Sequence, residues 1–311
     1  MISNDILEAI GHTPLVRLRR MTGPDMAEVL VKFEALNVGG SIKTRTAFNM
    51  ILEAEAKGLI RPDTVIVEPT SGNQGIGLAL CGAVRGYKVV IIMPDSVSEE
   101  RRKLMRHYGA EVKLVHDAGD IGRAIRECQE TVDAMAAADP RVFVPAQFDN
   151  PENPKIHETT TAQEILADVD GKIDAFCSGI GTGGTLTGIG HILKAANPDT
   201  LVVAIEPEEA AVLSGGMIGT HLQMGIGDGI VPPVLDSSII DEIEIVTDEE
   251  ALSTARRLAA EEGLLCGISG GTNVAVALRL AKRLGAGKRV VTVLPDTGER
   301  YFSTPLFEGD R

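Results

Sequence analysis

The sequence predicts an α/β protein made of two doubly wound, three-layer domains, each with a parallel sheet covered by helices on both faces. Short apolar runs of strand length alternate with longer amphipathic runs along almost the whole chain, a pattern typical of this class. The length of 311 residues suggests two domains rather than one. Because no Pro/Gly-rich linker separates the halves, we expect the two domains to be interleaved, with a cleft between them.

The elements follow one another in order along the chain. The first half begins with a strand over 28–36 and a helix over 41–58, which Ser41 caps and Gly58 ends. Further strands are predicted at 64–69, 88–94, 110–115 and 142–148, with helices at 75–86, 98–109 and 119–138. The second half has strands at 174–180, 201–207 and 289–295, with helices at 185–196, 248–262 and after 266. We therefore expect residues from about 30 to 145 to supply one sheet and residues 146–311 another.

The charge balance limits the kinds of partner. Thirty basic against 44 acidic residues give a net charge of −14, whereas nucleic acids and anionic membranes bind basic surfaces. No uncharged apolar run has the length of a membrane span, and the N-terminus shows no secretory signal. The four cysteines are far apart and the six histidines lack metal-ligand spacing. We expect a cytoplasmic protein with reduced thiols and no metal site, binding neither nucleic acid nor membrane.

The first loop of interest holds a cation where a helix disfavours one. In parallel α/β folds, ligands bind where strands lead into helices. Lys43 lies two residues after the predicted cap Ser41, at the positive end of the helix. A solvated lysine is the plain interpretation. The alternative is a nucleophilic or Schiff-base lysine, because an amine in this position is easier to deprotonate.

Two further loops are suited to anions. Residues 68–77, EPTSGNQGIG, gather hydroxyls, an amide and backbone N–H groups at a helix start, which suits a carboxylate, a phosphate or a simple polar turn. Residues 178–188, SGIGTGGTLTG, fit G-x-G-x-x-G, and Glu206 ends the next strand as a dinucleotide site would require. Thr182 and Thr185 add hydroxyl donors, which suit a phosphate monoester better than a pyrophosphate.

The four candidate loops together favour pyridoxal phosphate over a nicotinamide dinucleotide. In the fourth loop, residues 266–278, Ser269 precedes two glycines and a helix, where a capping serine is the simplest interpretation. A Schiff-base lysine, a carboxylate site, a phosphate site and a lone serine match pyridoxal phosphate with an amino-acid substrate. An NAD-dependent oxidoreductase has no use for Lys43 or Ser269 in these places, and it stays as a distant alternative.

Motifs along nearly the whole chain resemble the family of cysteine synthases (O-acetylserine sulfhydrylases) and cystathionine β-synthases. These motifs are IGHTPLVRL (10–18), GGSIKTR, EPTSGNQGIGLAL, QFDNPENPKIHETTTAQEI, GIGTGGTLTGIG, EEGLLCGISGG and LPDTGERYFST (294–304). The resemblance implies a pyridoxal-phosphate enzyme of fold type II, with a tryptophan synthase β-like fold. It implies a smaller, mobile domain over 38–147 and a larger domain from 1–37 and 148–311 that carries the phosphate loop. It also implies a homodimer, and a serine acetyltransferase whose tail would approach the loop holding Gln74.

The resemblance also implies a role for each matching residue. Lys43 matches the lysine that holds the cofactor, Asn73 the asparagine beside the pyridine 3′-oxygen, and Ser269 the serine on the ring nitrogen. The phosphate loop matches Gly181, Thr182, Gly183, Gly184 and Thr185. The substrate-binding positions are Thr70, Ser71, Gly72, Asn73, Gln74, Gln147 and Gly225.

Asp228 departs from the family pattern. It lies in MGIGDGIVPP (224–233), where the cysteine synthases carry a small residue, and the match places this loop over the substrate. A turn aspartate between two glycines is the plain interpretation. A carboxylate there would also act as an acid or base for water or a thiol, and would repel hydrosulfide. Gln74 departs too, because the family commonly has threonine at that position.

We therefore expect a β-replacement enzyme of cysteine metabolism that works through an α-aminoacrylate intermediate, with Lys43 as general base. A neutral Ser269 on the ring nitrogen suits β-elimination and replacement over transamination. The favoured reaction converts O-acetyl-L-serine and sulfide to L-cysteine and acetate. The alternative is a cysteine- or serine-using β-synthase or lyase that releases hydrogen sulfide, with Asp228 activating water or a thiol.

Overall fold

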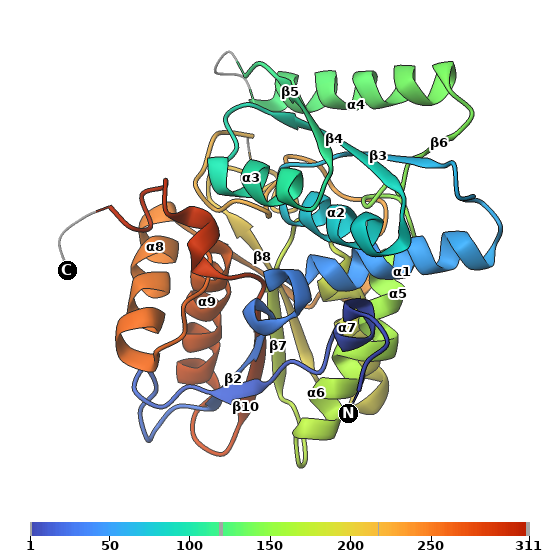
Figure 1. Cartoon of the computed structure of the whole chain (residues 1–311). Coiled ribbons are helices and arrows are strands. Elements are labelled where there is room, and N and C mark those ends of the chain that lie inside the picture. Colours follow the sequence, from blue (N-terminus) through green and yellow to red (C-terminus); the bar gives the residue numbers. More distant parts are fainter. Residues whose placement is uncertain (1, 118–120, 217, 309–311) are drawn as a thin grey trace.

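A computed structural model describes residues 2–117, 121–216 and 218–308 and shows two sheets, the smaller above the larger in Figure 1. The four-stranded sheet has the order β5-β4-β3-β6 and the six-stranded sheet the order β1-β2-β10-β7-β8-β9. Neighbouring strands are parallel in every pair except β1–β2. The predicted α/β class with two sheets is confirmed, and the sheets are parallel except for β1 at the edge of the larger one.

The smaller sheet is the middle of three layers. Its strands are β3 (Val65–Pro69), β4 (Lys88–Pro94), β5 (Glu111–Val115) and β6 (Val142–Phe143). Successive side chains of a strand point to opposite faces, so each strand contributes to two cores. Ile66 and Ile91 pack with α1 (Lys43–Ala56), α2 (Asn73–Arg85) and α3 (Glu99–His107). Val67 and Ile92 pack with α4 (Ile121–Ala138) on the other face.

The larger sheet is built in the same way. Its strands are β1 (Leu15–Arg17), β2 (Glu28–Phe33), β7 (Ala175–Gly179), β8 (Leu201–Pro207), β9 (Glu242–Val246) and β10 (Arg289–Leu294). Val203 and Val290 pack with α8 (Asp248–Arg257) and α9 (Ile268–Leu284). Phe176 and Val291 pack with α6 (Ala162–Asp168) and α7 (Gly184–Ala196).

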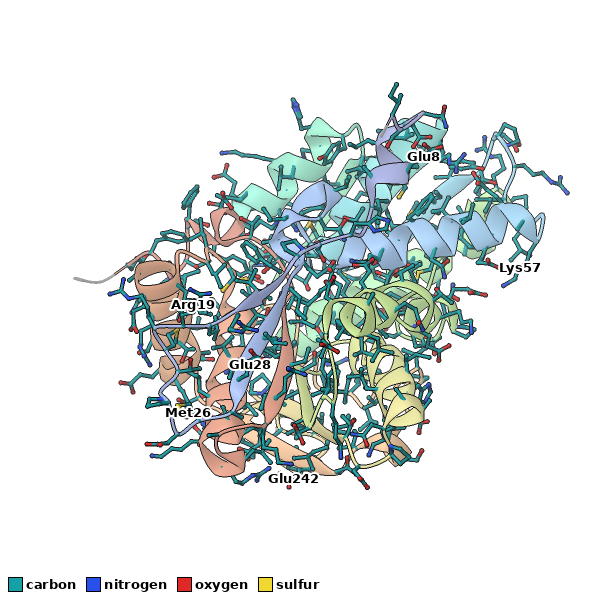
Figure 2. The ribbon with its side chains drawn as sticks, turned by 90° about the horizontal axis from the view of Figure 1, so that it is seen from below. Glu8, Arg19, Met26, Glu28, Lys57 and Glu242 are labelled. Atoms are coloured by element: carbon teal, nitrogen blue, oxygen red, sulfur yellow. The ribbon has the colours of Figure 1, made fainter. Side chains whose placement is uncertain are left out.

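Residues 28–33 belong to the larger sheet. The prediction that all strands from about 30 to 145 form one sheet is therefore wrong for this strand. β2 pairs with β10 from the far end of the chain and with β1. Figure 2 shows this side of the molecule from below, with Arg19 and Met26 on the connection between β1 and β2 and Lys57 at the far end of α1. The strand ends at Phe33, and the next three residues form a 3₁₀ turn.

Several other elements differ from the prediction. The predicted helix 248–262 is α8 followed by a π-helical turn, Leu258–Glu262. A second π-helical turn, His157–Thr161, joins α5 (Glu152–Ile156) to α6, and neither of these helices was predicted. The strand predicted at 142–148 is only two residues long. The predicted helix 119–138 begins outside the described residues.

The described residues include neither a membrane-spanning helix nor a metal-binding cluster, and all four cysteines are free thiols. No helix in ranges 2–117, 121–216 and 218–308 is long and apolar enough to cross a membrane. Within the same ranges, no three His, Cys, Asp or Glu side chains are grouped to hold a metal ion. All four cysteines are buried free thiols. Burial raises the pKa of Cys128 to about 11 and that of Cys81 and Cys177 to about 12.

Candidate active site

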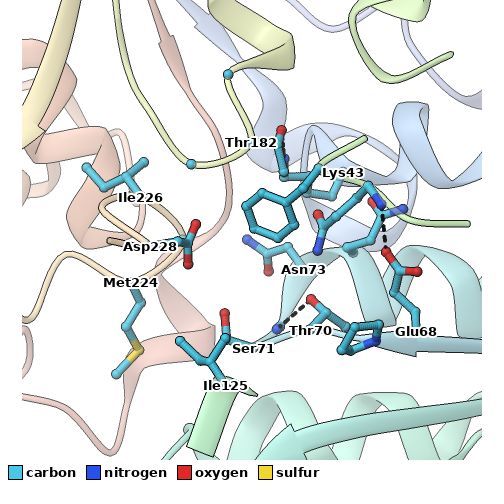
Figure 3. Close-up of a pocket in the computed structure, with 18 of the residues that line it drawn as sticks. Lys43, Glu68, Thr70, Ser71, Asn73, Ile125, Thr182, Met224, Ile226 and Asp228 are labelled. Atoms are coloured by element: carbon cyan, nitrogen blue, oxygen red, sulfur yellow. Dashed lines mark hydrogen bonds between the residues drawn. The ribbon is translucent and has the colours of Figure 1, made fainter. Parts of the chain in front are cut away.

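A cavity of about 400 Å³ is lined by residues from both sheets, at the C-terminal ends of their strands. Glu68 and Pro94 belong to the ends of β3 and β4, and Gly179 and Val293 to the ends of β7 and β10. This is where parallel α/β folds bind ligands. Figure 3 shows side chains around the cavity, with Glu68 and Thr70 from the part around the smaller sheet and Thr182 and Asp228 from the part around the larger sheet.

Four helices begin at this cavity, and none of the four is capped by the side chain of its N-cap residue. The N-caps of α2, α7 and α9 are Gly72, Gly183 and Gly267, and that of α1 is Ile42. Ser41 is not the cap of α1, contrary to the prediction, and its hydroxyl is buried without a hydrogen-bond partner in the part of the chain that the structure describes. The positive ends of four helix dipoles therefore converge on this cavity, which favours anionic ligands.

Lys43 is the first residue of α1, and its Nζ lies 3.4 Å from Thr182 Oγ1. Burial lowers the pKa of Lys43 to about 8, and the charge of Asp228 opposes part of this shift. At pH 7 the neutral amine therefore lies only about 1.4 kcal/mol above the ammonium form. The low pKa agrees with a lysine that must lose its proton, although burial is its largest cause.

The loop over 181–185 is packed so tightly that none of its three glycines has room for a side chain. A Cβ on Gly181 would lie 2.3 Å from the carbonyl oxygen of Gly225, and one on Gly184 would lie 2.1 Å from Asn153 Oδ1. Gly183 has a φ of 80°, which favours glycine. The loop is therefore packed closely against its support, and Gly181, Thr182, Gly183 and Thr185 line the cavity.

The two hydroxyls of this loop are held from behind. Thr182 Oγ1 accepts a hydrogen bond from Asn153 Nδ2 at 2.8 Å, and Thr185 Oγ1 lies 3.4 Å from His157 Nε2. His157 is buried in the π-helical turn before α6. Burial, followed by the charge of Arg45, lowers the pKa of His157 well below its usual value. The imidazole is therefore neutral and adds no charge behind the loop.

The loop that leads into α2 lines the cavity with residues of the predicted carboxylate site. Thr70, Ser71, Gly72 and Asn73 all lie on its wall. Thr70 Oγ1 accepts a hydrogen bond from the Gly72 N–H at 3.3 Å. The predicted carboxylate-binding positions are thus adjacent to the start of α2.

Gln74 also borders the cavity, but its side chain is committed to α1. Its Oε1 accepts a hydrogen bond from Thr46 Oγ1 at 2.9 Å, and its Nε2 lies 3.5 Å from Met50 Sδ. A substrate would meet the backbone of Gln74 rather than its amide.

Gln147 lines the cavity from the loop after β6, and Glu68 holds this loop in place. The N–H groups of Ala146 and Gln147 donate to the two carboxylate oxygens of Glu68, each at 3.0 Å. Ala146 has a φ of 53°, an uncommon conformation for a residue with a Cβ. Glu68 is fully buried, and burial raises its pKa to about 7.

Ser269 and Asp228 lie on the wall formed by the larger sheet. Ser269 is the second residue of α9 and is not its cap, because Gly267 takes that position. Asp228 shares its loop with Gly225 and extends toward the space in front of Lys43 (Figure 3). Its carboxylate makes no hydrogen bond to another described residue. Burial raises the pKa of Asp228, and the charge of Lys43 opposes the shift.

The family model described as pyridoxal-phosphate dependent enzyme matches residues 6–296 of this chain. The chain belongs to this family. It is 48% identical to a cysteine synthase of Staphylococcus aureus over 308 residues, which are 99% of this chain and 98% of the relative.

Solved structures agree with this assignment. The chain is similar to O-ureido-L-serine synthase, with a TM-score of 0.93, 46% identity, and coverage of 100% of this chain and 97% of that one. It is also similar to a hydrogen sulfide-producing enzyme from Fusobacterium nucleatum, with a TM-score of 0.91, 41% identity, and coverage of 97% and 98%. The prediction of a pyridoxal-phosphate-dependent enzyme of the cysteine synthase family, with fold type II, is confirmed.

The residues present fit pyridoxal phosphate. The glycine-capped starts of α2 and α7 offer first-turn N–H donors for a carboxylate and a phosphate group. Lys43 offers an amine that loses its proton readily, as attachment to an aldehyde requires. The distant alternative of an NAD-dependent oxidoreductase is dropped, because the family uses pyridoxal phosphate.

Sequence reasoning assigned no role to Glu68, Asn153, His157 or Asp296, all of which hold parts of the site. Each lies within a motif that carried the family resemblance. Their contacts are with backbone groups or with other side chains of the wall. A motif shows that such a residue matters to the family, but only the fold shows what it touches.

Proposed function

We propose that this enzyme carries out β-replacement on an amino acid in the cavity, converting O-acetyl-L-serine and sulfide to L-cysteine and acetate. The main support is that one cavity is lined by Lys43, residues 70–73, residues 181–183, Thr185 and Ser269, whereas Gly184 lies behind its wall. The similarity to a cysteine synthase at 48% identity supports this choice of substrates.

The residues that line the cavity would hold the cofactor and move the α-proton of the substrate. When bound, pyridoxal phosphate supplies an electron sink that stabilises negative charge at the α-carbon of an amino acid. The residues that would hold it are Lys43, Asn73, Gly181, Thr182, Gly183, Gly184, Thr185 and Ser269. Lys43 would remove the α-proton, since its neutral form is accessible at neutral pH. The uncharged hydroxyl of Ser269 would pair with the ring nitrogen without fixing a positive charge there.

The substrate carboxylate would bind at the start of α2. Thr70, Ser71 and Asn73 supply polar side chains there, next to the N-terminus of α2, and Gln147 lines the same cavity. Buried positive charge lies behind this loop, because a Cβ on Gly72 would lie 2.8 Å from Nε of Arg101. That charge favours an anion over a neutral group at this position.

Lys43 gives the test of the main proposal. The purified protein should show the visible absorption of bound cofactor and should form cysteine from O-acetyl-L-serine and sulfide. Lys43→Ala should lose both, while Lys57→Ala, at the opposite and exposed end of α1, should retain both. A parent protein that binds the cofactor yet forms no cysteine would contradict the choice of substrates.

Asp228 favours a second reaction at the same site. Its carboxyl has a raised pKa and no hydrogen-bond partner among the described residues, which suits a group that takes a proton from a neutral nucleophile. Water or a thiol would be such a nucleophile, and cysteine would then be the substrate that releases sulfide. The similarity to a hydrogen sulfide-producing enzyme supports this alternative.

Asp228→Asn separates the two reactions, because it keeps the shape and removes the proton acceptor. We expect sulfide release from cysteine to fall by about 100-fold or more, with cysteine formation from O-acetyl-L-serine changing far less. Asp199→Asn, on an exposed side chain, is the control. An equal loss of both reactions in Asp228→Asn would contradict the role of Asp228.

We also propose that residues 38–147 form a smaller, mobile domain and that 1–37 with 148–311 form the larger one. In this division the carboxylate loop lies on one domain and the phosphate loop on the other, so closure would bring the substrate to the cofactor. A homodimer, and docking of serine acetyltransferase near Gln74, are proposals that rest on the family resemblance alone.

A further inference from the structure

Asp296 and Arg300 belong to the motif LPDTGER, to which the sequence assigned no role. Their side chains are buried, with 0% and 3% exposed, and neither residue is on the cavity wall. Both contact Asn73, which does line the cavity. Asn73 Nδ2 donates to Asp296 Oδ2 at 2.7 Å, and Arg300 Nη1 donates to Asn73 Oδ1.

These two contacts leave the Asn73 amide only one orientation. A carboxylate only accepts hydrogen bonds, and a guanidinium only donates them. If the amide flipped, Asn73 Oδ1 would face the Asp296 carboxylate and its NH₂ would face the Arg300 guanidinium. Both charge-assisted hydrogen bonds would be lost at once, in a buried site where they are strong.

We propose that Asp296 is a positioning residue for the cofactor, acting through Asn73 with Arg300 as its counterpart. After the bond to Asp296, Asn73 Nδ2 retains one N–H, and this donor is available to an oxygen of the cofactor ring. An unfixed amide would offer either a donor or an acceptor. The inference rests on the proposed role of Asn73 beside the 3′-oxygen of pyridoxal phosphate.

The backbone around Asp296 extends its influence to two further helix starts. The Ile42 N–H donates to the Pro295 carbonyl at 2.8 Å, and the Gly267 N–H donates to the Asp296 carbonyl at 3.2 Å. Ile42 precedes Lys43, and Gly267 is the N-cap before Ser269. One short segment thus contacts the starts of α1, α2 and α9, which carry the three residues expected to meet the ring.

A double-mutant cycle tests whether Asp296 acts through Asn73. Asp296→Asn keeps the size of the side chain but can pair with either end of the amide. In the holoenzyme, we expect this change to speed cofactor release by about tenfold and to shift the pH midpoint of the cofactor's visible absorption. In an Asn73→Ala background, the same change should alter the release rate by less than about twofold.

Tyr301→Phe is the matched control, because Tyr301 donates to the same oxygen of Asp296, at 2.8 Å, without touching Asn73. It should leave the absorption midpoint unchanged. A purely structural role of Asp296 would instead give equal effects of Asp296→Asn in both backgrounds, and that result would overturn the inference. If Asp296→Asn does not fold, Arg300→Gln replaces it in the cycle with the same expectation and the same overturning result.

The cycle also separates this inference from the proposed function. If Asn73→Ala alone leaves cofactor release and absorption unchanged, the proposed role of Asn73 is wrong and the inference falls with it. If Asn73→Ala has an effect but the cycle is additive, only the positioning role of Asp296 is wrong.

Discussion

Lys43 and Lys57 lie near opposite ends of α1 and differ sharply in environment. Burial lowers the pKa of Lys43 to about 8. Lys57 is half exposed, and hydrogen bonding to Glu152 is the main cause that raises its pKa. One helix therefore carries a lysine that ionises near neutral pH and one that stays charged.

This contrast can be measured by reductive methylation of the cofactor-free protein, followed peptide by peptide with mass spectrometry. The neutral amine reacts, so the rate at Lys43 should rise with pH and reach half its maximum near pH 8. Lys57 should show no such midpoint below pH 10. Asp228→Asn should move the midpoint of Lys43 downward, because the Asp228 charge stabilises the ammonium form. A midpoint that stays fixed or rises would show that this carboxylate is not charged beside Lys43.

At the scale of single residues, the sequence predicts the residues that line the cavity but not the buried residues that hold them in place. Lys43, Thr70 and Thr182 were found because unusual residue types follow strands. A serine before a helix predicts a cap, but Ser41 forms a β-bridge with Asp296 and Ile42 takes the cap position. Glu68 and Asp296 were missed because their partners are distant in sequence, and only the fold brings them together.

Glu68 links two elements, since it lies near the end of β3 and holds the turn after β6. Its pKa is raised from 4.5 to about 7, so the folded protein holds this proton more tightly than the unfolded chain. Between pH 4.5 and 7 the unfolded state binds fewer protons, and this contribution to the free energy of unfolding falls as pH rises.

Glu68→Gln should remove this pH-dependent loss. The difference in free energy of unfolding, variant minus parent, should rise by up to about 3 kcal/mol from pH 4.5 to pH 7 and stay level above. Urea unfolding of the cofactor-free proteins across this range measures it. The lost carboxylate acceptor adds a constant offset, so the slope is the diagnostic quantity. A flat difference would mean that Glu68 titrates normally.

At the scale of elements, apolar periodicity predicts most single helices and strands, because each pattern lies within one short segment. The pattern of 248–262 does not distinguish an α-helix from one that ends in a π-turn, because both bury nearly the same side chains. The sheet to which 28–33 belongs depends on β10, about 260 residues later. No local signal carries that pairing.

Across the whole molecule, a buried charge cluster joins three distant segments. Arg45 on α1 donates two hydrogen bonds to Glu34, at 2.8 and 3.0 Å, and two to Glu164 on α6, at 2.6 and 2.7 Å. Arg45 and Glu34 are almost fully buried. This cluster fixes the helix that carries Lys43 against the larger sheet.

Arg45→Met should cost about 3–5 kcal/mol in free energy of unfolding, because it leaves the Glu34 charge buried without its cation. Arg141→Met breaks an exposed pair with Asp139 and should cost less than about 1 kcal/mol. Urea midpoints of the two variants provide the comparison. Similar costs for both would show that the buried cluster does not hold α1.

The four buried thiols have a practical consequence. With their thiolate forms suppressed by burial, they should react slowly with maleimides and other alkylating probes. A cysteine introduced at the surface would then be the dominant labelling position. A pair of such cysteines, one on α4 and one on α8, would report the separation of the two sheets by fluorescence energy transfer. The native cysteines would therefore add little background to an optical test of the proposed domain closure.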